Sequence, residues 1–364
     1  MTSGQAPNPQ LTLGAGSVGR NLGAGSFWNK TFDHSARVDQ TIERGGKPVL
    51  RRAVAEAQRE AARADLAEAQ RRARLAAAQQ YHELVATLGR AEEAASALSL
   101  AGQAQRAQEL RVKTGDVAPV EAIRLNLDAI RVQADLRQSE ADARSARNLL
   151  ATMLGVEIQA GTLTPSGFRL DAAAAEAASV AFASAGQRPD VVAAEHRLKA
   201  AQDGRALARA LQARDVSVGL QFDRWPVSAT NTSGTGNTVS VSVSVPLLIR
   251  HAYEGEAARA EADVNSALEV LRRARASAAS DLLQAQTHWA SAAARRRLAG
   301  DELMPAAERV AAAAEFAYRR GSLSLLDVLD ARRNLRSARL ERINAEADAA
   351  KAAAELEAAT FTQQ

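Results

Sequence analysis

Hydrophobic and polar residues alternate in four short segments of this chain. Residues 238–245 read Thr-Val-Ser-Val-Ser-Val-Ser-Val, so the valines share one face and the small polar residues share the other. The same alternation occurs in residues 216–223 and 11–14, and in residues 36–42 except at Gln40. Because successive side chains of a strand point to opposite faces, this period of two predicts β-strands with one apolar and one polar face.

Two long segments have the pattern of α-helices. Residues 48–113 contain only two glycines, Gly89 and Gly102, and residues 256–319 repeat this pattern with one proline, Pro305. At about 1.5 Å per residue, each helix would be roughly 100 Å long. Helices of this length need partners along their whole length. The return segment after the first helix has the 3-4 spacing of a coiled-coil seam, at Val120, Ile123, Leu127, Ile130 and Ala134.

The chain contains this arrangement twice, with an offset of about 206 residues. The first strand pair leads into a long helix and a turn at Gly115, and the second leads into a long helix and a turn at Gly321. Glycine at each turn permits the positive φ that ends a helix tightly. Between the copies, residues 156–171 are expected to form a loop or a short extended piece, followed by helices near 172–185 and 189–211.

The predicted fold class is mostly α with a small β part. Long coiled-coil helices and four strands account for most of the sequence. The chain divides into a first strand pair, a first helical hairpin, a collar segment leading into the second copy, a second strand pair, and a second hairpin with the C-terminal segment. The corresponding ranges are 1–45, 46–155, 156–213, 214–248 and 249–364.

The alternating strands have two explanations. A small two-sided sheet packed on helices has the same pattern. Strands of about 9–11 residues, apolar outside and polar inside, also match the wall of a transmembrane barrel. Phe27, Trp28 and Trp225 lie near strand ends, where membrane-interface aromatics are expected. Four strands cannot close a barrel and open edges are not tolerated in lipid, so the barrel explanation requires oligomerisation, with three copies as the natural solution.

Composition argues against several other classes. Of the 364 residues, 46% are hydrophobic but only 4% are aromatic, which is typical of long helices rather than of a compact core. The net charge of +4 comes from interspersed basic and acidic residues and not from a basic stripe, which disfavours nucleic-acid binding. The chain has no cysteine, and its five histidines form no catalytic or metal-binding motif. We therefore expect no enzyme activity, no cofactor and no metal site.

Several motifs occur in a fixed order along the chain. NPQL precedes the first strand, VDQTIERGGKPVLR leads into the first long helix, RPDVVAAEHRLKAAQ precedes the third strand, VSVPLL closes the fourth, and YRRGSLSLLDVLDARRNL forms the second turn. In this order, and with the duplication, the chain resembles the TolC-type outer-membrane efflux channels over nearly its whole length. The DQTIERGGK segment and the VPLL ending are most similar to the branch associated with cobalt, zinc and cadmium resistance.

The resemblance implies a homotrimer in the outer membrane of a Gram-negative bacterium. A twelve-stranded β-barrel would contact outer-membrane lipid, and a helical α-barrel would extend into the periplasm. It would dock on a periplasmic adaptor (membrane fusion) protein coupled to an inner-membrane pump of the resistance-nodulation-division type, and act as a passive exit duct for heavy-metal cations or small toxic compounds. Family chains also carry an export signal and two helical segments before the first strand, and this N-terminal segment is missing before Pro9.

The resemblance also implies residues of a periplasmic constriction. Asp327 and Asp330 resemble the aspartates that line it, Tyr318 resembles a tyrosine that helps to hold the closed state, and Glu121 is the equivalent of Asp327 in the first copy. Rings of like charge attract cations. Acidic residues are also favoured at helix starts, and Tyr318 could equally be a packing anchor, so both explanations stay open. Leu323 stands where some family members place a gating arginine.

The two helical turns resemble the tips that meet the adaptor. Their residues are Thr114, Gly115, Asp116, Arg320, Gly321 and Ser322. A rival function is a periplasmic adaptor or a coiled-coil scaffold without a pore, because long alanine-rich hairpins occur there too. An adaptor would have one hairpin, whereas this chain has two hairpins and two strand pairs, and a scaffold gives no reason for the valine face of residues 238–245. The channel is therefore the favoured function.

Overall fold

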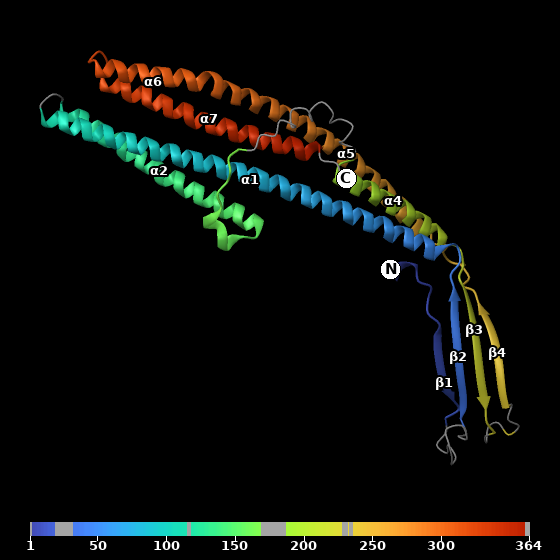
Figure 1. Cartoon of the computed structure of the whole chain (residues 1–364). Helices are drawn as coiled ribbons and strands as arrows, with labels where there is room; N and C mark the ends of the chain where they lie inside the picture. Colours follow the sequence, from blue (N-terminus) through green and yellow to red (C-terminus); the bar gives the residue numbers. More distant parts are fainter. Residues whose placement is uncertain are drawn as a thin grey trace. The chain divides into compact units, whose positions relative to one another are not determined.

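The computed structural model describes most of the chain, and its residues group into two compact units (Figure 1). The described residues are 2–18, 32–114, 118–168, 187–227, 232 and 236–360. We call the unit formed by residues 1–65 and 190–274 the strand unit. The unit formed by residues 66–189 and 275–364 is the helical unit.

The strand unit contains one antiparallel sheet with the strand order β1-β2-β3-β4 (Figure 1). The strands are β1 (Gln10–Gly16), β2 (Asp33–Ile42), β3 (Val216–Trp225) and β4 (Gly236–Ser244). All four predicted strands are confirmed, although β2 begins earlier than its alternating pattern indicated. The pairing of β2 with β3 joins the two copies of the repeat into one sheet.

The register of the sheet places apolar residues opposite one another on all four strands. One row consists of Leu11, Val38, Leu220 and Val241, and another of Leu13, Ala36, Phe222 and Val239. The row between them is polar and consists of Thr12, Arg37, Gln221 and Ser240. Because adjacent rows point to opposite sides, the alternation in the sequence gives a sheet with one apolar and one polar face.

Two adjacent glycines turn the chain from β2 into the first long helix. Gly45 and Gly46 have φ values of +75° and +70°, and a Cβ on Gly45 would lie 2.7 Å from the Cβ of Ala213. The ammonium group of the buried Lys47 donates hydrogen bonds to the carbonyl of Ala213 and the carboxylate of Asp215, both at 2.8 Å. This glycine-rich, basic segment is therefore a junction between strand and helix that also holds the residues before β3.

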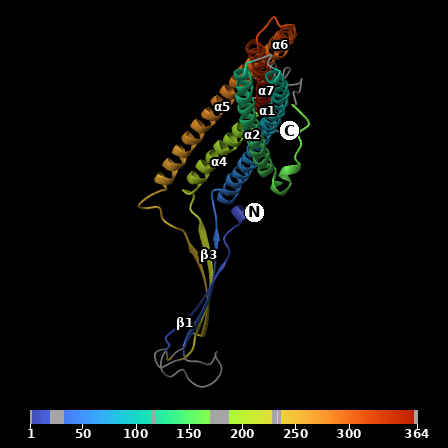
Figure 2. The ribbon, with the colours of Figure 1, turned by 90° about the vertical axis from the view of Figure 1, so that its left-hand side faces the viewer.

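Helices complete the strand unit. They are the short 3-10 helix η1 (Thr2–Gly4), α4 (Pro189–Ala210), and the first parts of α1 (Lys47–Lys113) and α5 (Glu254–Arg297). α4 and the beginning of α5 lie side by side in both views (Figures 1 and 2), where Arg205 donates to Glu261 at 3.0 Å. α4 confirms the helix predicted at 189–211, and the helix predicted near 172–185 lies outside the described residues.

The helical unit contains two hairpins. The rest of α1 and α2 (Pro119–Leu154) form the first hairpin, which is followed by the 3-10 helix η3 (Glu157–Thr162). The second hairpin contains the rest of α5, the π-helix η5 (Leu298–Leu303), α6 (Met304–Arg319) and α7 (Leu325–Thr360). α6 and α7 lie side by side in both views (Figures 1 and 2). α1 confirms the long helix predicted at 48–113.

The structure corrects the prediction of one uniform helix over residues 256–319. The π-helix η5 separates α5 from α6 and ends directly before the first helical turn of α6, which contains Pro305. Proline has no N–H to donate and its ring clashes with the preceding turn, so the regular α-helical hydrogen bonds cannot continue unchanged through it. The first copy has Ser99 at the equivalent position, and α1 continues there without interruption.

Small alanine side chains and a few large leucines form the contacts within each hairpin. Leu282 of α5 and Leu356 of α7 are both 0% exposed and pack with Ala285 and Ala359. The corresponding cluster between α1 and α2 contains Leu84, Ala146 and Leu150. Within the described part of the chain, no helix is both long enough and apolar enough to span a membrane.

Candidate functional site

The apolar face of the sheet is exposed on every strand. On the outer strands, Val241 is 73% and Leu13 is 72% exposed, and on the inner strand β3 Leu220 is 55% exposed. Leucine and valine side chains in this number rarely remain in water on the surface of a stable protein. A contiguous exposed apolar patch of this kind marks a surface that contacts a membrane or another protein.

The opposite face of the sheet carries a hydrogen-bonded polar network. Arg37 on β2 makes a bidentate contact with Asp39, at 2.7 and 2.8 Å. The same guanidinium donates to Gln221 on β3 at 3.4 Å and to Ser242 on β4 at 3.1 Å. The two faces therefore differ sharply in chemistry, as the wall of a barrel between lipid and water requires.

Trp225 lies at the end of β3, as the sequence indicated. Trp225 is two residues after Asp223 on the same strand, so its side chain lies on the polar face. Its indole N–H donates a hydrogen bond to the hydroxyl of Thr238 at 3.1 Å. Phe27 and Trp28 lie outside the described residues. A membrane-interface role for these three aromatic residues stays a prediction.

The turn between α6 and α7 has the geometry expected of a glycine-terminated helix. Gly321 has φ +77°, and its N–H donates to the carbonyl of Tyr318 at 2.9 Å, while the N–H of Ser322 donates to the carbonyl of Ala317 at 3.0 Å. These two bonds form a Schellman motif, which satisfies the last carbonyls of α6. At the first turn, the N–H of Thr114 donates to the carbonyl of Leu110 at 3.1 Å, and Gly115 and Asp116 lie outside the described residues.

Asp327 holds the start of α7. Its carboxylate accepts hydrogen bonds from the hydroxyl of Ser324 at 2.6 Å and from the N–H of Ser324 at 3.1 Å. The N–H of Asp327 donates back to the Ser324 hydroxyl at 3.3 Å, which completes a reciprocal capping arrangement. The helix-start explanation for Asp327 is therefore realised in the structure. Asp330, by contrast, has a side chain that is 60% exposed and lies 3.5 Å from Arg333.

Tyr318 links the two hairpins near their turns. Its hydroxyl accepts a hydrogen bond of 2.7 Å from Arg111 of α1, and the guanidinium carbon of Arg111 lies 5.8 Å from the centre of the tyrosine ring. Glu121 of α2 accepts a hydrogen bond of 2.8 Å from Gln108 of α1. Two of the four residues proposed for the constriction thus make contacts with α1. The sequence analysis missed Arg111, because nothing local indicates which residue of α1 faces Tyr318.

A series of basic residues on α7 forms ion pairs with three other helices. Arg333 contacts Asp128 of α2 at 2.7 Å, Arg336 contacts Asp135 of α2 at 2.9 Å, and the remaining pairs are Arg332 with Glu315 of α6 and Arg339 with Glu93 of α1. The hydrogen bond to Asp128 raises the pKa of Arg333. These pairs border a cavity of about 430 Å³. Arg332, Arg336 and Arg339 are four and three residues apart, so they lie on one face of α7, and this spacing in the sequence indicated the helix face that forms the ion pairs.

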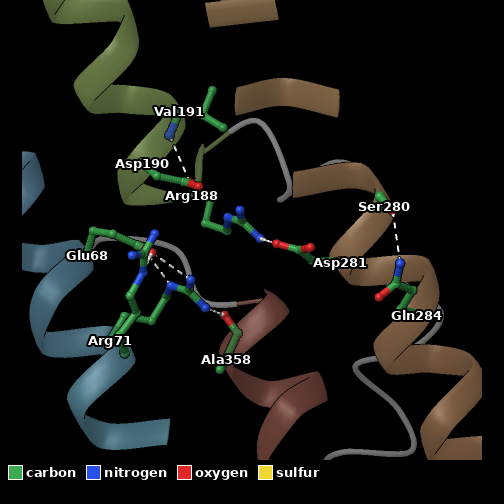
Figure 3. Close-up of polar contacts among 10 residues, drawn as sticks. Glu68, Arg71, Arg188, Asp190, Val191, Ser280, Asp281, Gln284 and Ala358 are labelled. Atoms are coloured by element: carbon green, nitrogen blue, oxygen red, sulfur yellow. Dashed lines mark hydrogen bonds and ion pairs between the residues drawn. The ribbon is translucent and has the colours of Figure 1, made fainter. Parts of the chain in front are cut away.

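Two buried arginines form ion pairs at the other end of the helical unit. Arg71 and Glu68 of α1 are both buried and lie 2.8 Å apart, and Arg71 donates to the carbonyl of Ala358 on α7 at 3.0 Å (Figure 3). Arg188 donates to Asp281 of α5 at 2.8 Å (Figure 3). Among the residues that the structure describes, no group of three or more acidic or histidine side chains is arranged to hold a metal ion.

Acid should weaken the contact between α1 and α7 at Glu83. Burial raises the pKa of Glu83, but the hydrogen bond and charge of Lys351, together with Arg90, outweigh burial and lower it overall. A carboxyl whose pKa is lowered on folding stabilises the fold above its unfolded pKa of about 4.3, and that stabilisation is lost as the pH falls through the folded pKa. Urea unfolding between about pH 3 and 7 should therefore show a stability loss below about pH 4 that is smaller in E83Q. If E83Q and E92Q, a change at an exposed glutamate of the same helix, gave the same pH profile, the expectation would be wrong.

Comparisons with known proteins agree with this architecture. The family model described as outer membrane efflux protein matches residues 183–360. The cobalt-zinc-cadmium resistance protein CzcC of Cupriavidus metallidurans is 25% identical over 311 residues, which cover 85% of this chain and 72% of that protein. The outer membrane protein VceC of Vibrio cholerae superimposes with a TM-score of 0.79 at 19% identity, over 99% of this chain and 89% of that one. The CmeC outer membrane channel of Campylobacter jejuni gives a TM-score of 0.77 at 16% identity, over 99% of this chain and 78% of that one. The chain is therefore similar to outer membrane efflux proteins in sequence over residues 183–360, and similar in fold to solved outer membrane proteins over nearly its whole length.

Proposed function

We propose that this protein is the outer-membrane channel of a tripartite efflux system, a passive exit duct located in the outer membrane of a Gram-negative bacterium and extending into the periplasm. The observation that carries this proposal is the four-stranded sheet, which is apolar and exposed on one face and polar on the other. The family match and the long helical hairpins agree with it. An adaptor or a coiled-coil scaffold would leave the exposed valine and leucine face without a function.

A homotrimer is the assembly that best fits the sheet. Each chain supplies four strands, and β1 and β4 are the two edges of the described sheet. Unpaired strand edges in lipid cost several kcal/mol per exposed backbone group. Pairing of β4 with β1 of the next copy in a ring of three removes both edges and forms a barrel of twelve strands. The periplasmic α-barrel, to which the helical hairpins of the three copies contribute twelve helices, belongs to the same proposal. So do the periplasmic adaptor, the inner-membrane pump and the division of the chain into the five segments predicted from the sequence.

Divalent heavy-metal cations are the proposed substrates. Support comes from the likeness to a cobalt-zinc-cadmium resistance protein. We further propose that Asp327, Asp330, Tyr318 and Glu121 lie at the periplasmic constriction, and that the turns at 114–116 and 320–322 contact the adaptor. Asp330 is the better candidate for attracting cations, because Asp327 already holds the helix start.

The test is outer-membrane fractionation of the full-length gene product, with boiled and unboiled samples compared on gels. We expect a heat-sensitive trimer in the outer membrane, and restored tolerance to cobalt, zinc or cadmium in a host that lacks its own channel. A monomer in the periplasm from a correctly exported chain would contradict the channel and favour a scaffold. A trimer that restores tolerance to organic compounds but not to metals would keep the channel and reject the metal substrates.

Removing the hydroxyl of Tyr318 should favour the open state. The bond from Arg111 to this hydroxyl crosses from α1 to α6, and at an exposed position it contributes about 1 kcal/mol, or roughly fivefold in the ratio of open to closed channels. Y318F should therefore raise conductance in lipid bilayers, and R111Q should have a similar effect. Because the two residues are partners, the double variant should add little to either single change. Additive effects would show that the two residues act separately.

A further inference from the structure

The Arg37 side chain spans three strands on the polar face of the sheet. Its guanidinium starts from β2, contacts Gln221 on β3 and ends at Ser242 on β4. Gly219 of β3 leaves the space that this path needs. A Cβ at Gly219 would lie 2.5 Å from Asp39 Oδ1 and from Ser242 Oγ, and 2.9 Å from Arg37 Nη2. The glycine therefore lets the guanidinium lie flat against the sheet.

Asp39 fixes the orientation of this guanidinium. It lies two residues from Arg37 on the same face of β2 and binds it through both carboxylate oxygens. Bidentate arginine–carboxylate contacts are among the stronger and more directional polar contacts in proteins. The pair is not buried, because the side chains of Arg37 and Asp39 are 37% and 28% exposed. Both charges can therefore act on an ion that passes over the polar face.

Arg37 also differs in charge from the other ionisable residues described on this face, which are all acidic. Among the described strand residues, the polar face carries one cation, Arg37, and three carboxylates, those of Asp33, Asp39 and Asp223. The formal charge of the face is thus −2 in each chain. Arginine stays protonated at any physiological pH, so its contribution to this charge is constant.

We propose that the Arg37–Asp39 pair is a charge-selective element in the lumen of the barrel, and that Arg37 limits how strongly this part of the channel favours cations over anions. This inference rests on the proposed function, because it requires the polar face to line an aqueous lumen. Threefold symmetry places three copies of the pair at one height, where charges of one sign act together on a passing ion. Arg37 then offsets carboxylates that would otherwise attract cations more strongly.

The test is the permeability ratio of potassium to chloride for purified trimers in planar lipid bilayers under a salt gradient. R37Q removes the cation and should raise this ratio about two- to fivefold. D39N leaves Arg37 without its carboxylate and should lower the ratio by a similar factor. The double variant R37Q/D39N should return close to the parent, because a neutral pair replaces an ion pair. The matched control is S240A, in the same row of the sheet as Arg37 but with no change in charge.

R37K separates charge from geometry. Lysine keeps the positive charge but cannot form the bidentate contact, so its ratio should stay within about twofold of the parent. If R37Q and D39N conduct with the parental ratio, the pair has only a structural role and the inference is wrong. If R37K changes the permeability ratio as much as R37Q does, the ion selectivity depends on the position of the guanidinium and not on its charge. That result would also overturn the inference. A full-length, correctly exported parent that forms no trimer and no conducting channel would instead reject the proposed function.

Discussion

Replacing Val241 by arginine should abolish assembly in the outer membrane, whereas the same replacement at the neighbouring Ser240 should be tolerated. Val241 is 73% exposed and ends the apolar row that begins at Leu11. An arginine facing lipid near the middle of a membrane costs about 2–4 kcal/mol in a barrel, and a trimer contains the change three times. Ser240 points to the polar face, where water and polar side chains can solvate a guanidinium.

The measurement is the amount of heat-sensitive trimer in the outer-membrane fraction. V241R should reduce it at least tenfold relative to S240R, since about 1.4 kcal/mol already corresponds to a factor of ten. The two variants have the same charge, size and strand, and differ only in the face that they occupy. Equal amounts of trimer for both variants would mean that the apolar face does not contact lipid, and the barrel orientation would have to be abandoned.

The strands and long helices could be predicted because their signals are local. The period of two in residues 238–245 depends on adjacent residues only, and so does the glycine that ends α6 at Gly321. Sheet order is different, because β2 pairs with β3 and thereby brings Val38 opposite Leu220 from the other copy of the repeat. No local pattern specifies this pairing. The π-helix before Pro305 was also missed, since proline indicates a disturbance but not the form that it takes.

The candidate site was predictable only where a single turn of helix forms it. The capping contact of Asp327 with Ser324 needs three residues of spacing and nothing else, so the helix-start explanation was available from the sequence. The contact of Arg111 with Tyr318 depends on how α1 and α6 are aligned along their lengths. That alignment follows from the summed packing of many alanines, which are nearly interchangeable in sequence and carry little information about register.

The second large effect is expected at Leu282, where truncation to alanine should destabilise the second hairpin by about 2–5 kcal/mol. Leu282 is 0% exposed and packs against Leu356, which is equally buried. The surrounding residues include Ala285 and Ala359, whose short side chains cannot move into the space that a missing isobutyl group leaves. The result should therefore fall in the upper half of this range, because the cost grows with the volume of the cavity that remains.

The matched control is Leu283, the next residue, which is 49% exposed in the single chain. For both variants, the measurement is the rate at which the trimer is lost on heating in detergent. A rate is compared because membrane trimers often unfold irreversibly. L282A should accelerate the loss strongly, since the buried cluster lies within one chain and weakens in every copy. L283A should have an effect of about 0.5 kcal/mol or less if its side chain stays in water. An L283A effect as large as that of L282A would mean that a neighbouring copy covers Leu283, whereas a negligible effect of L282A would contradict the packing of α5 against α7.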